Sequence, residues 1–555
     1  MKRSTFSSLR VSSRRLGALL VLLIAGSGLL WTGCDIGAID DGIGLIVDFS
    51  PASTTVSGQV LDAKTQAPIE SAAVTVRFSG PDAGRVVDVD GDALTELTVP
   101  DVSLINFNLD GAEPSEDNPA EVSMAISAPG YITTNERVLI GSTDHTFSAT
   151  LTSVSDTPSG VEATVESFSS RNGAPVEDVT VTTDFEDATG AQTSLRIPAG
   201  TVMRDVDGTP LQGNVEATVV YYSNQDDAAR DAFPGGFLGV NVTENEDDLE
   251  SGGSFITAGF AAIEVVDEQG RKARQFDGPI DIEIDVPPGT TNPETGQAVQ
   301  SGDSVPVYSF NEETGEWVFE GRTEATLADA SARKSQGTLA VSFQTQHLTY
   351  WNLDWYWSPR CSRADQIMFN GMPANWRGFF RWTLRDAETG QRLRSGSHYR
   401  GNFLRFYNAP REWPMTLQMV DPVSGQVVAE GTLNDLCDGG TLDATIPDRV
   451  SVDVHATITC DDDTEIRPSN YSVWYRPASG SPWGYARLSS GRATISDLIE
   501  GGEYLFYVRL LGRWEIRTVR IQEGETVDGV LVTRTSEDGF RADVDFRDTD
   551  GSVCG

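Results

Sequence analysis

From about residue 50 onward, apolar residues of this 555-residue chain alternate with polar ones, and clusters of Gly, Pro, Asn and Asp interrupt each run. The segments Ala73–Phe78, Asp281–Val286 and Tyr504–Leu510 show this pattern clearly. Because successive side chains of a strand point to opposite faces, a period of two indicates half-buried β-strands rather than helices. Many short strands separated by turns are typical of sandwiches. We therefore predict an all-β fold of tandem β-sandwich domains of the immunoglobulin-like kind.

The first 33 residues have the composition of an export signal. Residues 1–15 carry five basic side chains and no acid, and residues 16–30 form an uncharged, mostly apolar run. That run is too short to cross a hydrocarbon core of about 30 Å comfortably. It leads to Trp31-Thr32-Gly33-Cys34, which resembles a bacterial lipobox, although Trp31 stands where the family pattern usually has Leu. The resemblance implies cleavage before Cys34 and acylation of this cysteine, with an uncleaved anchor or ordinary signal cleavage as alternatives.

This reading predicts a lipoprotein of the cell envelope. Residues 1–33 would be the signal peptide and residues 34–53 a linker, and acyl chains on Cys34 would hold the protein on a membrane, facing the periplasm or the exterior. The formal net charge of −41 argues against a nucleic-acid partner, which requires a basic footprint. Lys is rare and Asp abundant, which is the halophile-like composition of a protein kept soluble at high salt. A GC-rich genome would also favour Arg over Lys.

Two regions share a pattern at the ends of the chain. Residues 54–153 begin with Val56-Ser57-Gly58-Gln59-Val60 and later contain Ala128-Pro129-Gly130-Tyr131 and a closing strand. This region resembles the carboxypeptidase regulatory-like domain, a transthyretin-like β-sandwich that is a non-catalytic appendage in the enzymes that give it its name. Residues 450–555 resemble the second half of the same domain through Gly501-Gly502-Glu503-Tyr504 and the strand that follows. Residues 356–449, with two hairpin-like turn sequences, are expected to form a further small β-sandwich.

The central block, residues 161–355, has a different pattern. It contains Ile197-Pro198-Ala199-Gly200 and ends in His347–Asn352, which includes a Trp-Asn pair. These segments are similar to ZU5-like modules of surface proteins. The resemblance implies an interaction or matrix role.

Four cysteines follow Cys34, all in the last 200 residues. They allow three pairings, and an oxidising envelope permits disulfides. Sequential pairing would close one loop within each of two successive domains. A metal site is disfavoured, because no two of these cysteines are near neighbours and no His flanks them. The disulfide candidates are Cys361, Cys437, Cys460 and Cys554.

The sequence lacks the familiar catalytic motifs. None of its four histidines belongs to an HExxH or HxxE zinc motif, and no GxSxG elbow, P-loop or strand-linked GxGxxG is present. We therefore expect no enzyme activity and no cofactor. A hydrolase with a hidden carboxylate pair is the less favoured alternative.

Two Asp clusters offer a weak calcium hypothesis, since Ca²⁺ prefers oxygen ligands. The first cluster lacks the glycine position and the final Glu of an EF-hand loop. Asp and Gly also form ordinary β-turns, and we favour that interpretation; no metal site is therefore predicted. The clustered residues are Asp88, Asp90 and Asp92 in the first group and Asp543, Asp545, Asp548 and Asp550 in the second.

One segment opposes the overall acidity. Between Tyr350 and Trp413 there are ten arginines and five acids, together with many aromatic residues. In a strand from Trp376 to Arg385, one face would be apolar and the other rich in arginine. Arginine forks bind carboxylate, sulfate or phosphate at two points. The alternative is that this positive face docks the acidic neighbouring domains. The predicted ligand-binding candidates are Arg377, Phe379, Arg381, Arg385 and Arg405.

These observations predict a lipid-anchored envelope protein with a structural or binding role and no catalysis of its own. Its partners would be the membrane, through the lipid anchor, and an envelope polysaccharide or another surface protein. The main alternative is a carbohydrate-binding accessory module of a polysaccharide-processing system.

Overall fold

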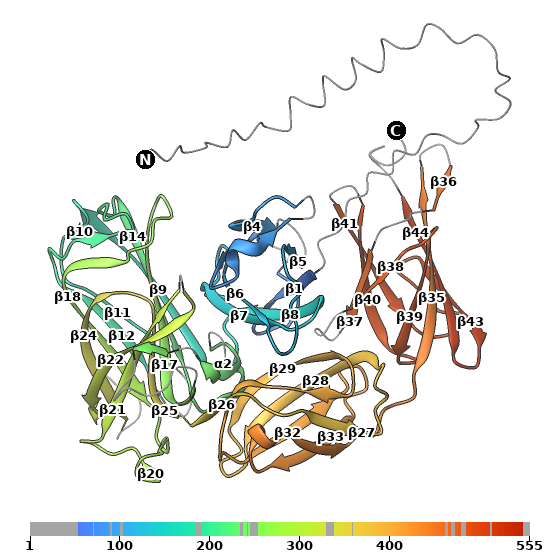
Figure 1. The fold of residues 1–555 in the computed structure, drawn as a ribbon. Helices are drawn as coiled ribbons and strands as arrows, with labels where there is room; N and C mark the ends of the chain where they lie inside the picture. Colours follow the sequence, from blue (N-terminus) through green and yellow to red (C-terminus); the bar gives the residue numbers. More distant parts are fainter. Residues whose placement is uncertain are drawn as a thin grey trace, which may run out of the picture. The chain divides into compact units, whose positions relative to one another are not determined.

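The computed structural model describes residues 54–547 with short gaps, and strands dominate it (Figure 1). The predicted signal peptide, the linker and Cys34 lie outside the described residues. All described residues belong to one compact unit. The gaps are 70–71, 89–90, 100–103, 184–189, 234–236, 241, 245–252, 313, 329–337, 358, 461–463, 468–471, 479–483 and 511–512.

We group the strands into four modules, A to D, which follow one another along the chain. Module A contains β1–β8 and the short 3₁₀ helix η2. Its elements are β1 (Thr54–Asp62), β2 (Val74–Ser79), η2 (Ala83–Arg85), β3 (Val86–Val87), β4 (Glu96–Val99), β5 (Leu104–Leu109), β6 (Ala120–Ser127), β7 (Thr134–Ile140) and β8 (Asp144–Leu151).

Module B contains β9–β25 and the helix α2. Its elements are β9 (Val161–Arg171), β10 (Ala174–Pro175), β11 (Val179–Thr182), β12 (Thr193–Ile197), β13 (Met203–Arg204), β14 (Asn214–Tyr222), α2 (Asp227–Asp231), β15 (Leu238–Val240), β16 (Val242–Glu244), β17 (Gly253–Asp267), β18 (Gln275–Val286), β19 (Thr291–Asn292), β20 (Gln297–Ala298), β21 (Ser304–Asn311), β22 (Glu316–Glu324), β23 (Thr326–Leu327), β24 (Leu339–His347) and β25 (Tyr350–Trp357).

Module C contains β26–β34 and the 3₁₀ helix η4. Its elements are β26 (Arg360–Arg363), β27 (Ile367–Asn370), β28 (Arg377–Asp386), β29 (Arg392–Arg400), β30 (Phe403–Leu404), β31 (Tyr407–Pro410), β32 (Met415–Val420), β33 (Val427–Leu433), η4 (Leu436–Asp438) and β34 (Gly440–Asp443).

Module D contains β35–β44. Its elements are β35 (Val450–Thr459), β36 (Glu465–Ile466), β37 (Ser472–Pro477), β38 (Gly484–Arg487), β39 (Arg492–Leu498), β40 (Glu503–Leu510), β41 (Arg513–Arg520), β42 (Thr526–Val527), β43 (Val530–Ser536) and β44 (Gly539–Arg547).

Modules A, C and D share one strand topology. In each, one strand lies between an antiparallel and a parallel neighbour: β1 between β5 and β8, β27 between β30 and β34, and β35 between β39 and β44. The facing sheets have the matching orders β4-β2-β6-β7, β29-β28-β32-β33 and β38-β37-β40-β41. Each module is therefore a two-layer sandwich built on the same strand connections, and the predicted fold class of tandem β-sandwiches is confirmed.

The cores follow from the period-two pattern. In β32 and β35 every second residue is buried, because one face of the sheet packs on the core and the other is partly exposed to solvent. Modules A, C and D each have one apolar cluster between their two sheets. The sequence of these strands alternates because only one face of each sheet is buried.

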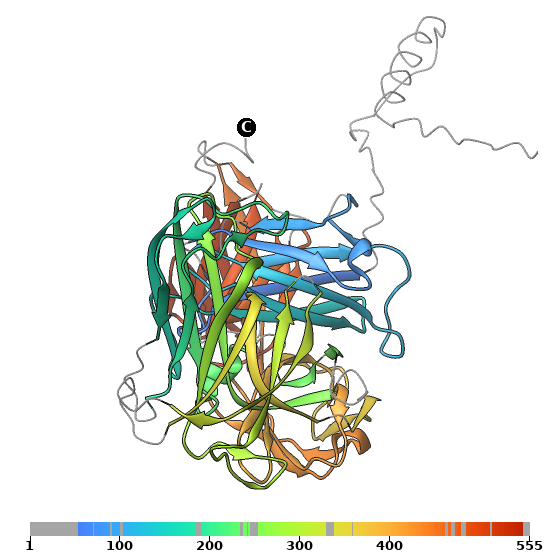
Figure 2. The same ribbon diagram turned by 90° about the vertical axis from the view of Figure 1, so that its left-hand side faces the viewer.

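Module B is larger and has apolar layers on both faces of one sheet. Its nine-stranded sheet, which includes β14, β17 and β25, packs against a six-stranded sheet to form the main core (Figure 2). A second cluster, rich in aromatic side chains, covers the outer face, with residues from α2 and the segment after it. Strands β14 and β25 are consequently buried on both faces and read as nearly continuous buried runs.

Candidate interaction surface

The arginine-rich segment forms β25 of module B and β26–β31 of module C. Its apolar row is core, as predicted: Phe380, Trp382 and Leu384 lie in the module C cluster. On the opposite row of β28, the side chains of Arg377 and Phe379 lie outside the described part of the structure. Four of the arginines whose side chains are described pair with acids of other modules: Arg363, Arg385, Arg392 and Arg405.

The first group of contacts joins β28 and β29 to helix α2 of module B. Arg385 Nη2 lies 2.9 Å from Asp227 Oδ2, and Arg392 Nη2 lies 3.2 Å from the same oxygen. Arg392 also pairs with Asp231, and Arg230 pairs with Asp227 from within the helix. Although burial raises the pKa of Asp227, the hydrogen bond from Arg385 and the charges of its other cationic neighbours hold it below the usual range. The Asp227 carboxylate thus partly neutralises the charges of Arg230, Arg385 and Arg392.

The second group of contacts joins module C to the loop that follows β5 in module A. Arg405 Nη1 lies 2.6 Å from Glu116 Oε2, and the Tyr407 hydroxyl donates to the Glu116 carbonyl at 3.2 Å. Arg363 pairs with Asp117 in the same loop. The Arg405 side chain is 12% exposed but the Glu116 side chain is 45% exposed, so solvent is excluded from only one side of this pair.

A third contact places Glu136 of β7 near Arg394 of β29. Burial raises the pKa of Glu136 to about 7, and the charge of Arg394 opposes this rise. Burial likewise lowers the pKa of Arg394, while Glu136 raises it. Each group therefore favours the charged form of the other, but their attraction does not fully offset the loss of water.

Arg449, in the connection between β34 and β35, ties modules C and D together. Its side chain is 9% exposed and pairs with the fully buried carboxylate of Asp421. Its guanidinium lies 5.2 Å from the ring centroid of Trp376 and 5.5 Å from that of Phe380. Arg449 Nη1 also donates to the Asp497 carbonyl of module D at 3.3 Å. Charge pairing, cation–π contact and a backbone hydrogen bond thus converge on one linker residue.

Arg381, the last of the predicted candidates, lines a cavity of about 880 Å³. Burial, followed by the charge of Arg476, lowers its pKa. Arg392, Arg394 and Trp382 also line the cavity, together with residues of α2 and of β8. Glu136, Asp226, Asp227 and Asp231 line the cavity as well, so the guanidinium groups that could accept an anionic ligand share this space with four carboxyl groups.

The structure therefore separates the predicted ligand-binding residues. Arg385 and Arg405 are paired with acids of modules B and A, Arg381 lines the cavity, and these three do not form one continuous row of unpaired donors. Sequence reasoning missed Arg392 and Arg394, which also line the cavity. Their position on the strand that pairs with β28 was a usable signal.

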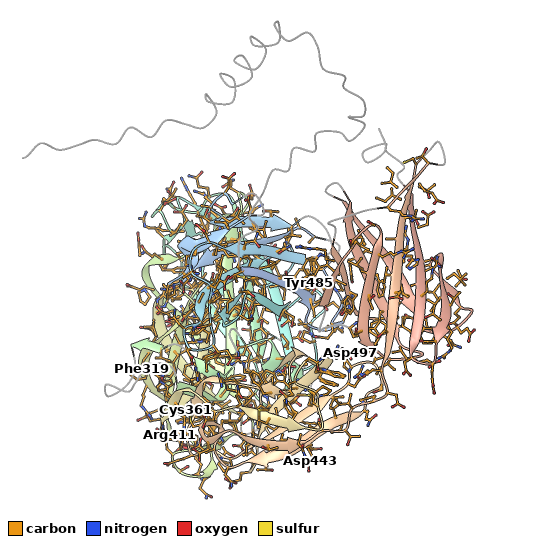
Figure 3. All side chains as sticks on the ribbon, turned by 45° about the vertical axis from the view of Figure 1, so that its right-hand side comes forward. Phe319, Cys361, Arg411, Asp443, Tyr485 and Asp497 are labelled. Carbon is orange, nitrogen blue, oxygen red and sulfur yellow. A yellow bond between two sulfur atoms is a disulfide. The ribbon has the colours of Figure 1, made fainter. Side chains whose placement is uncertain are left out.

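The cysteines and the Asp clusters have structural roles where they are described. Cys361 and Cys437 form a disulfide within module C (Figure 3, where Cys361 is labelled), which confirms that pair. Cys460 is also disulfide-bonded, and Cys554 lies outside the described residues.

In the Asp clusters, the Asp88 carboxylate accepts the Asp92 amide in a turn, and Asp543 pairs with Arg541. Asp545 accepts the hydroxyl of Thr459. Within the described ranges, no group of three or more His, Cys, Asp or Glu could hold a metal ion. The remaining members, Asp90, Asp548 and Asp550, lie outside those ranges.

Among the described helices, none has the length and apolar character that crossing a membrane requires.

The comparisons with known proteins leave the family open. No family model and no curated protein matches the chain. Among solved structures, the minor pilin GBS52 of Streptococcus agalactiae is 11% identical, with 33% of this chain and 96% of that chain covered and a TM-score of 0.17. The Bacillus anthracis TIE protein is 9% identical (97% and 79% covered, TM-score 0.14). The major pilin subunit BcpA of Bacillus cereus is 7% identical (89% and 99% covered, TM-score 0.14). TM-scores this low carry no weight for fold or function.

Proposed function

We propose that this protein is a lipid-anchored scaffold of the cell envelope that has no catalytic activity of its own. The signal-like residues 1–33 and the lipobox-like segment ending at Cys34 would place it on a membrane, and the four sandwich modules would extend from that anchor. In this proposal the arginine-rich segment is an internal clamp rather than a ligand-binding surface.

The observation that carries the proposal is the identity of the arginines' partners. Arg385, Arg392 and Arg405 reach carboxylates in α2 and in the loop after β5, which belong to other modules. Exposed ion pairs contribute little, but partly buried pairs that converge on shared carboxylates resist rearrangement, because opening them leaves charges poorly solvated. A locally positive segment in an acidic chain is thus explained by contacts inside the protein.

A second candidate function is the binding of an acidic envelope polysaccharide. The cavity favours it, because Arg381, Arg392 and Arg394 line it beside the ring of Trp382. Two-point recognition of carboxylate or sulfate by guanidinium groups would be the mechanism. Binding of an acidic polysaccharide would weaken as the salt concentration rises, and this salt dependence distinguishes it from the internal clamp.

Metabolic labelling with a clickable fatty acid tests the anchoring part of the proposal. Expressed in a bacterial host, the full chain should incorporate the label and fractionate with membranes, and the Cys34→Ser variant should do neither. A control variant, Cys361→Ser, should retain the label, because Cys361 lies in module C and not in the lipobox-like segment. A wild-type chain without label would contradict lipid anchoring.

A further inference from the structure

Three polar side chains are buried together on the outer face of the nine-stranded sheet of module B. Thr257 comes from β17, and Asn352 and Asp354 come from β25. Their residues are 4%, 0% and 0% exposed, respectively. The two strands are antiparallel neighbours in which Thr257 is paired with Asp354. Residues paired across two strands have side chains on the same face, so all three groups can meet.

A β-bulge brings the hydroxyl of Thr257 toward the amide of Asn352. The pairing shifts between Thr257 and Gly259, and Gly259 has a φ of +138°, which favours glycine. The Gly259 amide donates to Thr257 Oγ1 at 3.0 Å, and Thr257 Oγ1 in turn donates to Asn352 Oδ1 at 3.4 Å. Asn352 Nδ2 donates to Asp354 Oδ2. The hydroxyl, the amide and the carboxyl group thus form a chain of contacts.

Asp354 is costly to bury in this arrangement. Its Oδ1 atom is buried without a hydrogen-bond partner in the described structure. Burial raises the pKa of Asp354 well above its usual range, and the hydrogen bond with Thr257 offsets the rise only in part. A buried acid without a cationic partner is expensive in a purely structural core, and such groups recur where proteins perform proton transfer.

We propose that Thr257 and Asn352 become joined by an intramolecular ester, with Asp354 as the proton carrier. The Thr257 oxygen attacks the Asn352 side-chain carbonyl carbon, so that a C–O bond forms while the C–N bond breaks. Asp354 gives its proton to the departing nitrogen and receives the hydroxyl proton of Thr257, so that it ends protonated as it began. Ammonia leaves, and no oxidant, reductant or other reactant is consumed.

The placement of the three groups lowers the activation barrier for this step. Groups held in contact react with effective concentrations that reach about 10⁵–10⁸ M in well-oriented systems. Exclusion of water protects the ester from hydrolysis, and ammonia that escapes to solvent as ammonium does not readily return. The ester would link β17 and β25, two central strands of module B, covalently. This inference does not depend on lipid anchoring or on the proposed scaffold role.

Peptide mapping of the reduced, full-length protein tests the inference directly. Trypsin should release Thr257 in the peptide 231–271 and Asn352 in the peptide 335–360, because no Lys or Arg lies inside either peptide before its last residue. We expect these two peptides to appear as one linked species whose mass is their sum less one ammonia. Hydroxylamine should cleave that species.

Variants distinguish the loss of ester formation from the loss of folding. Thr257→Ser keeps a hydroxyl and should retain the linked species, whereas Thr257→Val and Asp354→Asn should abolish it. The wild-type map is decisive even where a variant folds poorly. Separate peptides of unaltered mass in the folded wild-type protein would overturn the inference, and so would a linked species that persists in Thr257→Val.

Discussion

Replacing Arg449 with Met should destabilise module C and its connection to module D strongly. The substitution keeps an apolar stem of similar length against Trp376 but removes the only cation that an ion pair in the described structure gives Asp421, whose side chain is fully buried. Breaking a buried pair by removing one partner costs about 3–5 kcal/mol, because the remaining charge is left in a poorly solvating environment. With a urea dependence of about 2 kcal/mol/M for a small domain, the midpoint should fall by roughly 2 M.

Asp421 offers a matched rescue of this variant. Its Oδ1 atom accepts the amides of Val423 and Ser424 and forms the turn, whereas its Oδ2 atom faces Arg449. The double variant Arg449→Met with Asp421→Asn keeps the turn acceptor and removes the buried charge, so it should recover a substantial part of the loss.

Urea titration followed by tryptophan fluorescence measures these effects, with Arg77→Met as the control. Arg77 pairs with Glu96, but both side chains are largely exposed, so its loss should change stability by about 0–1 kcal/mol. If Arg449→Met and Arg77→Met have the same midpoint, or if the Asp421→Asn change adds to the damage, the reasoning about buried charge is wrong.

Three further predictions address other contacts. The pKa of Glu136 is raised from 4.5 to about 7, so its contribution to stability is complete below 4.5 and is lost as the pH rises through 7; Glu136→Gln should abolish this component of a pH series of melting temperatures, and an unchanged slope would refute it. The Cys361–Cys437 disulfide closes a loop with a sequence separation of 76, so replacing both cysteines with Ala should cost about 4–5 kcal/mol by the chain-entropy model, and calorimetry showing no loss would contradict this. A Cβ atom at Gly396 would lie 2.4 Å from the Trp382 ring, so Gly396→Ala should cost about 1–3 kcal/mol in a urea titration, and a neutral effect would show that the ring moves freely.

The sequence predicted the fold class well, because a strand that is half buried must alternate. Strands such as β32 and β35 bury every second residue, and this pattern is local and visible without a structure. Buried strands of module B were harder to interpret. The run Tyr350–Trp357 is buried on both faces because a second apolar cluster covers the outer side of its sheet, and alternation cannot report such a layer.

The candidate surface could be predicted only in part. The arginine-rich segment was visible as a local excess of charge, and the apolar face of β28 was assigned correctly to the core. The partners of Arg385 and Arg405 were not predictable, because Asp227 and Glu116 lie 158 and 289 residues away in the chain. Such pairs arise from the packing of modules, and a single sequence holds no local signal for them.

Hydrogen exchange of the full chain, measured together with retention on an acidic polysaccharide, tests the clamp most directly. The variant in which Arg385, Arg392 and Arg405 are all replaced by Ser should exchange faster in α2 and in residues 110–118, which carry the acidic partners. Retention of the wild type and the variant should be equally weak. Unchanged exchange in these two segments, with polysaccharide retention that is strong in the wild type and lost in the variant, would contradict the account and favour a ligand-binding surface.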